Sequence, residues 1–390
     1  MSQALTGNKQ VFISDIHMGD QRSMTTDANH THPYGWLIKN IANLTNFLSD
    51  QLKARDVGQV VILGDLFDRW VFPTNFEPPP PLQYLEDICE ANQDIIDNLQ
   101  ALAKSGKLSY VPGNHDMSFC QEDISDFKKF INDKFEGINF ICYENDEKQP
   151  TGVYHAYNNK LVAEHGNMYC VFNAPDIWTN HDSFLPLGYF ISRIVAYKVW
   201  RTGKGQCIPD IIYKYIKQLE IFKKEPDFIE KFLFAVAGDA GLDRDSPINM
   251  HNISGFPESI PIVKVADSYK DLMANWDKDE NHKKNGSWTA AEGDYLPDGL
   301  AWPAYAFYLG PGTNPNFKVA IFGHTHVYEM RDFSLNPPRD TAIYVNSGTW
   351  VDSKPCTYVE TEVDKGKHRH YVRIKSYPGN QLIREMFATL

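Results

Sequence analysis

Five short blocks of this sequence contain Asp, Asn and His residues at spacings that could hold metal ions. In chain order they are Ser14-Asp15-Ile16-His17, Gly64-Asp65-Leu66-Phe67-Asp68, Gly113-Asn114-His115-Asp116, Glu164-His165-Gly166 and Gly323-His324-Thr325-His326. Carboxylate, amide and imidazole ligands suit manganese, iron, zinc and magnesium. Two such ions side by side can promote hydrolysis at phosphorus. The blocks therefore predict a binuclear metal site with hydrolytic chemistry.

Two of the blocks place a pair of ligands two residues apart. Asp15 and His17 follow the first expected strand, and His324 and His326 have the same spacing. Side chains two apart in an extended chain lie on the same side, so each pair can face one site. Asp15 and His17 would then serve one ion together, whereas His324 and His326 would serve one ion each.

The remaining ligands come from the three middle blocks. Asp65 ends the second expected strand, and its carboxylate has two oxygens that can bridge two ions. Asn114 offers a neutral carbonyl oxygen, which leaves the ions more electrophilic, and His165 follows a separate strand. Each block alone is a common loop sequence. All of them occur directly after β-rich segments, and this conjunction favours a metal site over coincidence.

The segments around the first blocks predict the framework that positions them. Apolar runs at 9–13, 57–63 and 108–111 are expected strands, separated by helical patterns at 33–54 and 85–104. This β-α-β-α-β order is typical of a buried, largely parallel sheet, in which sites collect at the carboxyl ends of the strands. Further strands are expected at 137–143, 153–164, 317–322, 342–345, 357–363 and 370–376.

A long stretch between the fourth and fifth blocks differs in character. Residues 184–200 are strongly apolar, but they include charges and are fewer than the roughly 20 residues that span a membrane. Helical patterns follow at 211–222 and 228–236, and then the sequence is irregular. We expect one catalytic domain over 1–390, with a helical cap inserted at about 180–310. Contact of the apolar helix with a membrane surface stays open.

Basic side chains recur along this apolar segment and just after it, at Arg193, Lys198, Arg201 and Lys204. They either contact a second phosphate or a carboxylate of a substrate, or they are solvated charges on a packed helix, which is the interpretation we favour. Trp70 likewise has two interpretations: it forms a wall of the substrate pocket, or it packs in the protein interior.

The composition limits the partners and the compartment. The 390-residue chain has a net charge of −12, so it lacks the excess of Lys and Arg that neutralises nucleic-acid phosphates. Its first ten residues are polar, and no secretory signal is expected. Six dispersed cysteines form no C-x-x-C pair, which argues against a cysteine zinc site or a disulfide scaffold. We therefore expect a cytoplasmic protein, and the sequence leaves its oligomeric state open.

Taken together, the blocks resemble those of the calcineurin-like metallophosphoesterases, whose pattern is D-X-H, G-D-X-X-D, G-N-H-D/E, H and G-H-X-H. The resemblance covers about 9–170 and 317–352. It implies an α/β fold, a four-layer sandwich of two mixed β-sheets flanked by helices. It also implies an enzyme, a phosphodiesterase, pyrophosphohydrolase or phosphomonoesterase that uses water activated by two metal ions. Manganese is the first expectation, with iron, zinc or magnesium as alternatives.

Carried over by position, the resemblance gives each residue of the blocks a role. The first metal would be bound by Asp15, His17, Asp65 and His326, and the second by Asp65 as a bridge, Asn114, His165 and His324. His115 would not bind metal; it would protonate the leaving oxygen or stabilise charge on the phosphoryl group. Asp116 would hold the His115 imidazole in place, and Asp68 would support the ligand loop.

Two segments, Gly64 to Trp70 and Asn346 to Val351, resemble the branch of this family that contains UDP-2,3-diacylglucosamine pyrophosphohydrolases. Those enzymes also carry a helical cap. This chain departs from them because it is longer and has His115 where their block has Arg. The expected substrate is therefore a small or amphiphilic phosphate ester.

Three other functions stay open at this point. The first is a metal-binding protein-interaction module on the same fold without turnover, which the intact ligand set argues against. The second is a nuclease, which the acidic charge and the absence of a basic stripe do not favour. The third is a lipid-facing enzyme whose apolar helix at 184–200 touches a membrane.

Overall fold

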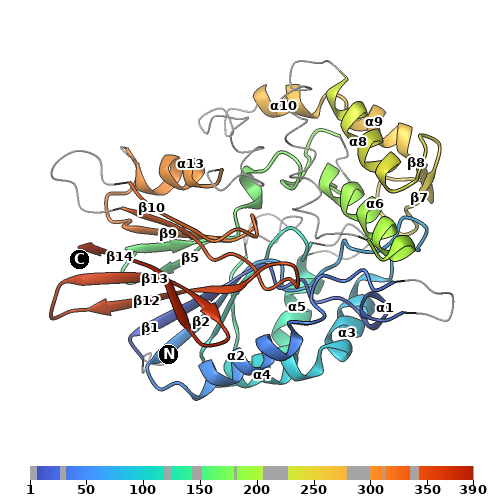
Figure 1. The fold of residues 1–390 in the computed structure, drawn as a ribbon. Coiled ribbons are helices and arrows are strands. Elements are labelled where there is room, and N and C mark those ends of the chain that lie inside the picture. Colours follow the sequence, from blue (N-terminus) through green and yellow to red (C-terminus); the bar gives the residue numbers. More distant parts are fainter. Residues whose placement is uncertain are drawn as a thin grey trace.

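Two β-sheets packed face to face form the centre of the protein, and helices cover both outer faces (Figure 1). In this computed structural model the described residues are 7–26, 32–117, 124–142, 152–179, 182–204, 227–278, 299–310, 312–333 and 342–389. The expected α/β sandwich of two mixed sheets flanked by helices is confirmed.

The first sheet has seven strands in the order β14-β13-β12-β1-β2-β3-β4. Strands β1 to β4 are parallel, whereas β12, β13 and β14 run antiparallel to their neighbours. Their bounds are β1 Lys9–Ile13, β2 Val57–Leu63, β3 Leu108–Val111, β4 Asn139–Phe140, β12 Cys356–Asp364, β13 Arg369–Tyr377 and β14 Gln381–Thr389.

The second sheet has five strands in the order β10-β11-β9-β6-β5. Strands β6, β9 and β11 are parallel, and β5 and β10 are antiparallel edge strands. Their bounds are β5 Tyr154–Ala156, β6 Leu161–Ala163, β9 Val319–Phe322, β10 Glu329–Asp332 and β11 Ile343–Asn346. The sequence predicted neither β10 nor β14.

Burial on both faces explains why the central strands are apolar throughout. In β2, Val60 and Ile62 pack against the outer helices, whereas Val61 and Leu63 pack against the second sheet, as the two-residue period of a strand requires. The helices on the first sheet are α2 Ile41–Lys53, α3 Pro81–Ala91, α4 Gln93–Lys104 and α5 Ile124–Lys134. The second sheet is covered by α13 Ala301–Ala304 and a π-helical turn at Tyr305–Leu309.

The helix expected at 85–104 is two helices, α3 and α4, that break at Asn92. The Asn92 side chain is buried and donates hydrogen bonds to the carbonyl oxygens of Gly19, at 2.9 Å, and Ile88, at 2.8 Å. An internal side chain that bonds to backbone in this way competes with a continuous helix. The break therefore fixes the helices to the loop that follows β1.

The cap lies over one end of the sandwich, at the upper right of Figure 1. Its described elements are α6 Leu187–Thr202, α8 Phe228–Asp239, β7 Pro247–Asn249, β8 Ser259–Pro261, α9 Ile262–Tyr269 and α10 Leu272–Lys278. The short helices α9 and α10 lie where the sequence predicted irregular structure, and the helix expected at 211–222 lies outside the described residues. Residues 301–309 pack on the second sheet instead of the cap.

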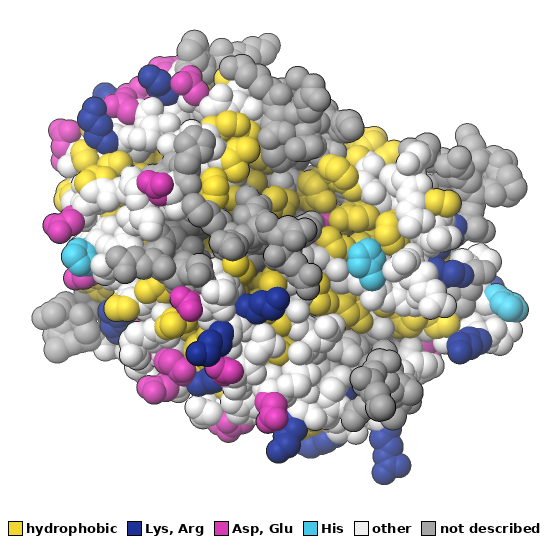
Figure 2. Space-filling view, turned by 180° about the vertical axis from the view of Figure 1, so that it is seen from behind, with side chains coloured by type: hydrophobic (Ala, Val, Ile, Leu, Met, Phe, Trp, Pro, Cys, Tyr) yellow, Lys and Arg dark blue, Asp and Glu magenta, His cyan; other side chains and the backbone are white. Residues whose placement is uncertain are grey.

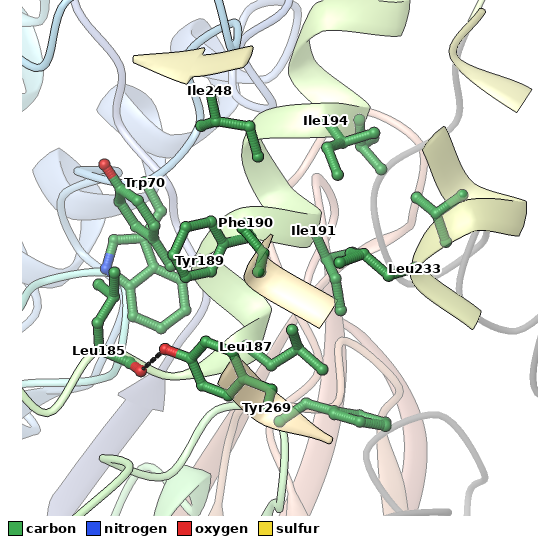
Figure 3. Close-up of a cluster of buried hydrophobic side chains, with 14 of the residues drawn as sticks. Trp70, Leu185, Leu187, Tyr189, Phe190, Ile191, Ile194, Leu233, Ile248 and Tyr269 are labelled. Atoms are coloured by element: carbon green, nitrogen blue, oxygen red, sulfur yellow. Dashed lines mark hydrogen bonds between the residues drawn. The ribbon is translucent and has the colours of Figure 1, made fainter. Parts of the chain in front are cut away.

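Helix α6 forms the centre of the cap. Figure 3 shows Tyr189, Phe190 and Ile194 of this helix among side chains from other cap elements, with Trp70 of the core beside them. Residues Leu187 to Ala196 are all buried, so this part of the helix has no apolar face available to a bilayer. The membrane contact that the sequence left open therefore does not involve these residues. Among the described helices, none has the length and hydropathy to cross a membrane.

Arg193 ties the cap to the core. It is fully buried, and its guanidinium donates to the carbonyl oxygens of Phe76, at 2.7 Å, Pro73, at 3.2 Å, and Asn249. It also lies 4.3 Å from the centre of the Phe72 ring. A guanidinium engaged in this way does not contact a phosphate, so both interpretations offered by the sequence are wrong for Arg193.

Replacing Arg193 with Met is expected to lower the free energy of unfolding by about 3–5 kcal/mol, because several buried carbonyl oxygens lose their donor. Lys198→Met on the same helix is the control. Lys198 makes a partly exposed ion pair with Asp239 at 2.6 Å, and its loss should cost less than about 1 kcal/mol. Urea unfolding monitored by circular dichroism measures both changes. Equal stability of the two variants would contradict this account of the cap.

Candidate metal centre

The five blocks meet at the carboxyl ends of strands from both sheets. Asp15 follows β1, Asp65 follows β2, Asn114 follows β3, His165 follows β6 and His324 follows β9. The strands bring these residues together because parallel neighbours end at the same edge of a sheet. All of the candidate ligands are buried, so the site is shielded from bulk water.

Five of the candidate ligands have left-handed backbone conformations. The φ angles are 53° at Asp15, 55° at His17, 53° at Asp65, 72° at His324 and 58° at His326. Such angles are uncommon for residues with a Cβ and persist where the surrounding structure enforces them, often at functional sites. Here they end each strand abruptly and turn the side chains toward one another.

The side chains form three overlapping groups that could hold a metal ion. Asp15, His17 and His326 make one group, Asp65, His165 and His324 make a second, and Asp65 with His17 and His115 makes a third. Asp65 lies between the first two groups, with its Oδ2 3.6 Å from Nε2 of His17 and 3.3 Å from Nε2 of His165. This is the position that a bridging carboxylate needs.

The orientation of the His165 ring shows that its Nε2 atom needs a bound cation or a proton. Nδ1 of His165 lies 2.7 Å from the carbonyl oxygen of Leu63, so it carries the hydrogen. Nε2 of the neutral ring would then turn a lone pair toward Oδ1 of Asn114, at 3.0 Å, and Oδ2 of Asp65, at 3.3 Å. Lone pairs repel one another at such distances. The donor set therefore fits a metal ion among these atoms.

A similar convergence occurs in the first group. Nε2 of His17 lies 3.1 Å from Nε2 of His326, which in turn lies 3.2 Å from Oδ1 of Asp15. Burial lowers the pKa of His17 to about 4, so its imidazole is neutral at physiological pH. Burial alone would raise the pKa of Asp15, but the neighbouring His326 holds it below its usual value. Neutral imidazole and ionised carboxylate are the forms that bind metals.

His115 lies against the same cluster but is oriented by Asp68. Nδ1 of His115 is 3.0 Å from Oδ1 of Asp68, and the backbone N–H of His115 donates to Oδ1 of Asp65 at 2.7 Å. The ring stacks on Trp70, with centroids 4.5 Å apart. Asp68 and Trp70 therefore fix the imidazole from two sides, and Nε2 is the ring atom left for a ligand.

The expected contact between Asp116 and the His115 imidazole is wrong. The Asp116 carboxylate accepts hydrogen bonds from the backbone N–H groups of Gly113 and Asp65, both at 2.7 Å, and Phe67, at 2.8 Å. Because consecutive side chains in this turn point in different directions, the imidazole faces Asp68 and the carboxylate faces backbone. Asp116 thus joins two ligand loops. Burial, followed by the charge of Asp65, raises the pKa of Asp116 to about 7.

Comparison with known proteins identifies the family. The sequence profile described as calcineurin-like phosphoesterase matches residues 9–233, more than half of the chain. The chain belongs to this family. No curated protein matches it, so the resemblance to the UDP-2,3-diacylglucosamine branch stays an expectation. Among solved structures, GAP50, the anchor in the inner membrane complex of Plasmodium, is similar over 98% of this chain and 88% of that one. The identity of 10% and TM-score of 0.31 carry no argument about function.

Two residues beside the candidate metal centre, Trp36 and Asn173, were not predicted from the sequence. The Trp36 ring lies 4.4 Å from the ring of His17 and 5.7 Å from that of His326. The Asn173 amide lies 3.4 Å from Nε2 of His324. Neither residue belongs to a recognisable block, so no local signal in the sequence could have found them. Their contacts orient the candidate ligands from outside the metal cluster.

A glycine of the third block is required by close packing. A Cβ at Gly113 would lie 2.3 Å from Oδ1 of Asp65 and 2.8 Å from Nε2 of His165. Both neighbours are buried in the cluster and cannot move aside without displacing it. This explains the glycine before Asn114 in steric terms.

Metal binding to this protein is expected to release protons at pH 7–8. Although burial lowers the pKa of His165, the carboxylates of Asp65 and Asp15 raise it to about 9. The metal-free imidazole is therefore protonated at pH 7.5, and a bound ion must displace that proton. Apparent metal affinity should consequently rise with pH up to about 9. Isothermal titration calorimetry with Mn²⁺ in buffers of different ionisation enthalpy measures the protons released. Buffer-independent heats at pH 7.5 would contradict this expectation.

Proposed function

We propose that this protein is a hydrolase of phosphate esters that depends on two metal ions. The observation that carries the proposal is the placement of Asp65 between two ligand groups, with His115 against the same cluster. An interaction module without turnover would need neither the complete ligand set nor an oriented imidazole beside it. The family membership supports hydrolysis as the reaction class.

In this proposal the first ion is held by Asp15, His17, Asp65 and His326, and the second by Asp65, Asn114, His165 and His324. Manganese is our first choice, and iron, zinc or magnesium would also suit oxygen and imidazole ligands. When bound, such ions supply Lewis-acid stabilisation of a phosphoryl group and activation of water.

The other residues of the site bind, orient and move a proton. Asp68 holds Nδ1 of His115, so Nε2 can donate a proton to the leaving oxygen or a hydrogen bond to the phosphoryl group. Asp116 keeps the Asp65 and Gly113 loops in register through backbone hydrogen bonds. Trp36 and Trp70 exclude water from two sides of the histidine cluster.

The substrate class is a small or amphiphilic phosphate ester, and phosphodiester, pyrophosphate and phosphomonoester bonds are all compatible with the site. A nucleic-acid substrate is not favoured. On the face shown in Figure 2, the described Lys and Arg side chains are interspersed with Asp and Glu and form no continuous basic stripe. Binding to nucleic acid depends on such a stripe.

Hydrolysis of bis-p-nitrophenyl phosphate and p-nitrophenyl phosphate by manganese-loaded protein tests the proposal. Cleavage of the diester would indicate a phosphodiesterase or pyrophosphohydrolase, and cleavage of the monoester alone would indicate a phosphatase. If two ions bind and neither ester, nor any longer phosphate ester, is cleaved, then the alternative holds: a metal-binding interaction module on this fold.

A further inference from the structure

The turn at residues 170–174 lies between the candidate metal centre and the cap, within the green part of the chain in Figure 1. Phe172 of this turn packs inside the cap, where its ring stacks on Phe232 of α8 with centroids 5.6 Å apart. The next side chain, Asn173, is buried, and its amide nitrogen lies 3.4 Å from Nε2 of His324. Two consecutive side chains therefore contact the cap and a candidate metal ligand.

The orientation of the His324 ring requires a hydrogen-bond acceptor at Nε2. Nδ1 of His324 lies 3.2 Å from Nε2 of His165, so it faces the second group of candidate ligands. A neutral imidazole that gives its Nδ1 lone pair to an ion carries its hydrogen on Nε2, and metal-bound histidines donate that hydrogen to an outer partner. The Asn173 amide lies at that atom. Its oxygen and nitrogen exchange places when the amide turns by 180°, and the oxygen then accepts the hydrogen.

The same turn fixes the start of α6. The backbone N–H of Gly188, in the first turn of this helix, donates to the carbonyl oxygen of Phe172 at 2.7 Å. A Cβ at Gly188 would overlap Oδ1 of Asn173 and would lie 2.7 Å from the carbonyl oxygen of Phe172. The glycine thus allows the helix to approach the amide closely. A larger residue at this position would displace the amide from His324.

We propose that Asn173 is a positioning residue that couples the second ion site to the cap. Its amide oxygen accepts the Nε2 hydrogen of His324 and so holds Nδ1 toward the ion, while its packing against Gly188 fixes that ring relative to α6. The inference rests on the two-ion centre of the proposed function. It adds a link between binding of the second ion and the position of the cap. Because such coupling is reciprocal, an ion that binds more tightly when the cap is docked also stabilises the docked cap.

Replacement of Asn173 by Leu and by Asp separates a hydrogen bond from space filling. Leu has a similar size but no acceptor. It should weaken the binding of one Mn²⁺ ion by about 10–100-fold, as loss of the outer partner of a metal-bound histidine does, and leave the other ion unaffected. Asp keeps an oxygen acceptor and should retain the affinity of the wild type for both ions. Asn46→Leu, the same change at an exposed position of α2, is the control. Isothermal titration calorimetry with Mn²⁺ measures the affinities.

Gly188→Ala tests the link from the cap. Gly188 supplies no metal ligand, but the added methyl group would displace the Asn173 amide, so this variant should lose affinity for the same ion. In an Asn173→Ala background there is no amide to displace, and Gly188→Ala should then change the affinity little further. Hydrogen exchange gives a second readout. Mn²⁺ should slow exchange of the Gly188 backbone amide in the wild type, and Asn173→Leu should remove this protection.

The outcomes separate this inference from the proposed function, because none of the readouts depends on turnover. Unchanged affinity for both ions in Asn173→Leu, or weaker binding in Asn173→Asp than in Asn173→Leu, would overturn the role of the amide while the two-ion centre stands. Additive losses in the double variant would overturn the link to the cap. A wild-type protein that binds fewer than two ions would contradict the proposed function and this inference together.

Discussion

Replacing Asp65 with Asn is expected to lower kcat/KM for phosphate esters by at least about 10³-fold and to reduce the bound metal below two ions per chain. Asp65 lies 3.3 Å from His165 and 3.6 Å from His17, so the substitution removes a negative charge shared by both proposed ions. Lewis-acid stabilisation contributes several kcal/mol to the transition state, and each 1.36 kcal/mol is a factor of ten in rate. Steady-state kinetics and metal analysis by mass spectrometry measure the two effects.

Asp94→Asn, an exposed carboxylate in the first turn of α4, serves as the control and should keep two ions and full activity. An Asp65→Asn variant that retained two tightly bound ions and wild-type turnover would remove Asp65 from the bridging position. It would also remove the observation on which the proposed function depends.

Replacing His115 with Ala should lower kcat by about 10²–10⁴-fold, the range of general acid catalysis, and leave both ions in place. The reason is that Nδ1 of His115 is engaged by Asp68 at 3.0 Å, which leaves Nε2 as the ring atom that would meet a substrate oxygen in the proposed reaction. His115 also belongs geometrically to a group with His17 and Asp65 that could hold an ion. Metal content therefore decides between the two interpretations: loss of one ion from His115→Ala would make this residue a ligand.

Asp68→Asn provides the companion to that experiment. If Asp68 acts by orienting the imidazole, its replacement should lower kcat about 10–100-fold. In a variant that already lacks His115, the same replacement should lower kcat little further. Additive losses in the double variant would mean that Asp68 acts on another part of the site, for example through its 3.5 Å approach to His17.

The strands and the ligand blocks could be predicted from sequence because both depend on local patterns. Apolar runs such as 57–63 are strands because both faces of the sheets are buried, and Asp65 and Asn114 follow such runs directly. The structure brings together all seven candidate ligands named from the sequence. The predicted β-sandwich is confirmed by the two sheets, and the family is confirmed by the matching sequence profile.

The contacts that orient the site could not be predicted, because they depend on distant segments or on side-chain direction. Trp36 belongs to none of the five blocks, and only the folded chain brings its ring against His17. Asp68 and Asp116 are both plausible partners of His115 by spacing, and only the geometry of the turn selects Asp68. From the sequence, Arg193 was interpreted as a solvated charge on a packed helix. In the structure its guanidinium is buried and donates to carbonyl oxygens of a core loop.

The most direct test of the central claim is an anomalous difference map from crystals of the full chain grown with manganese. We expect two peaks, both in contact with Asp65, one among Asp15, His17 and His326 and the other among Asn114, His165 and His324. A single peak, or peaks that lie away from Asp65, would contradict the binuclear centre on which the proposed hydrolysis depends.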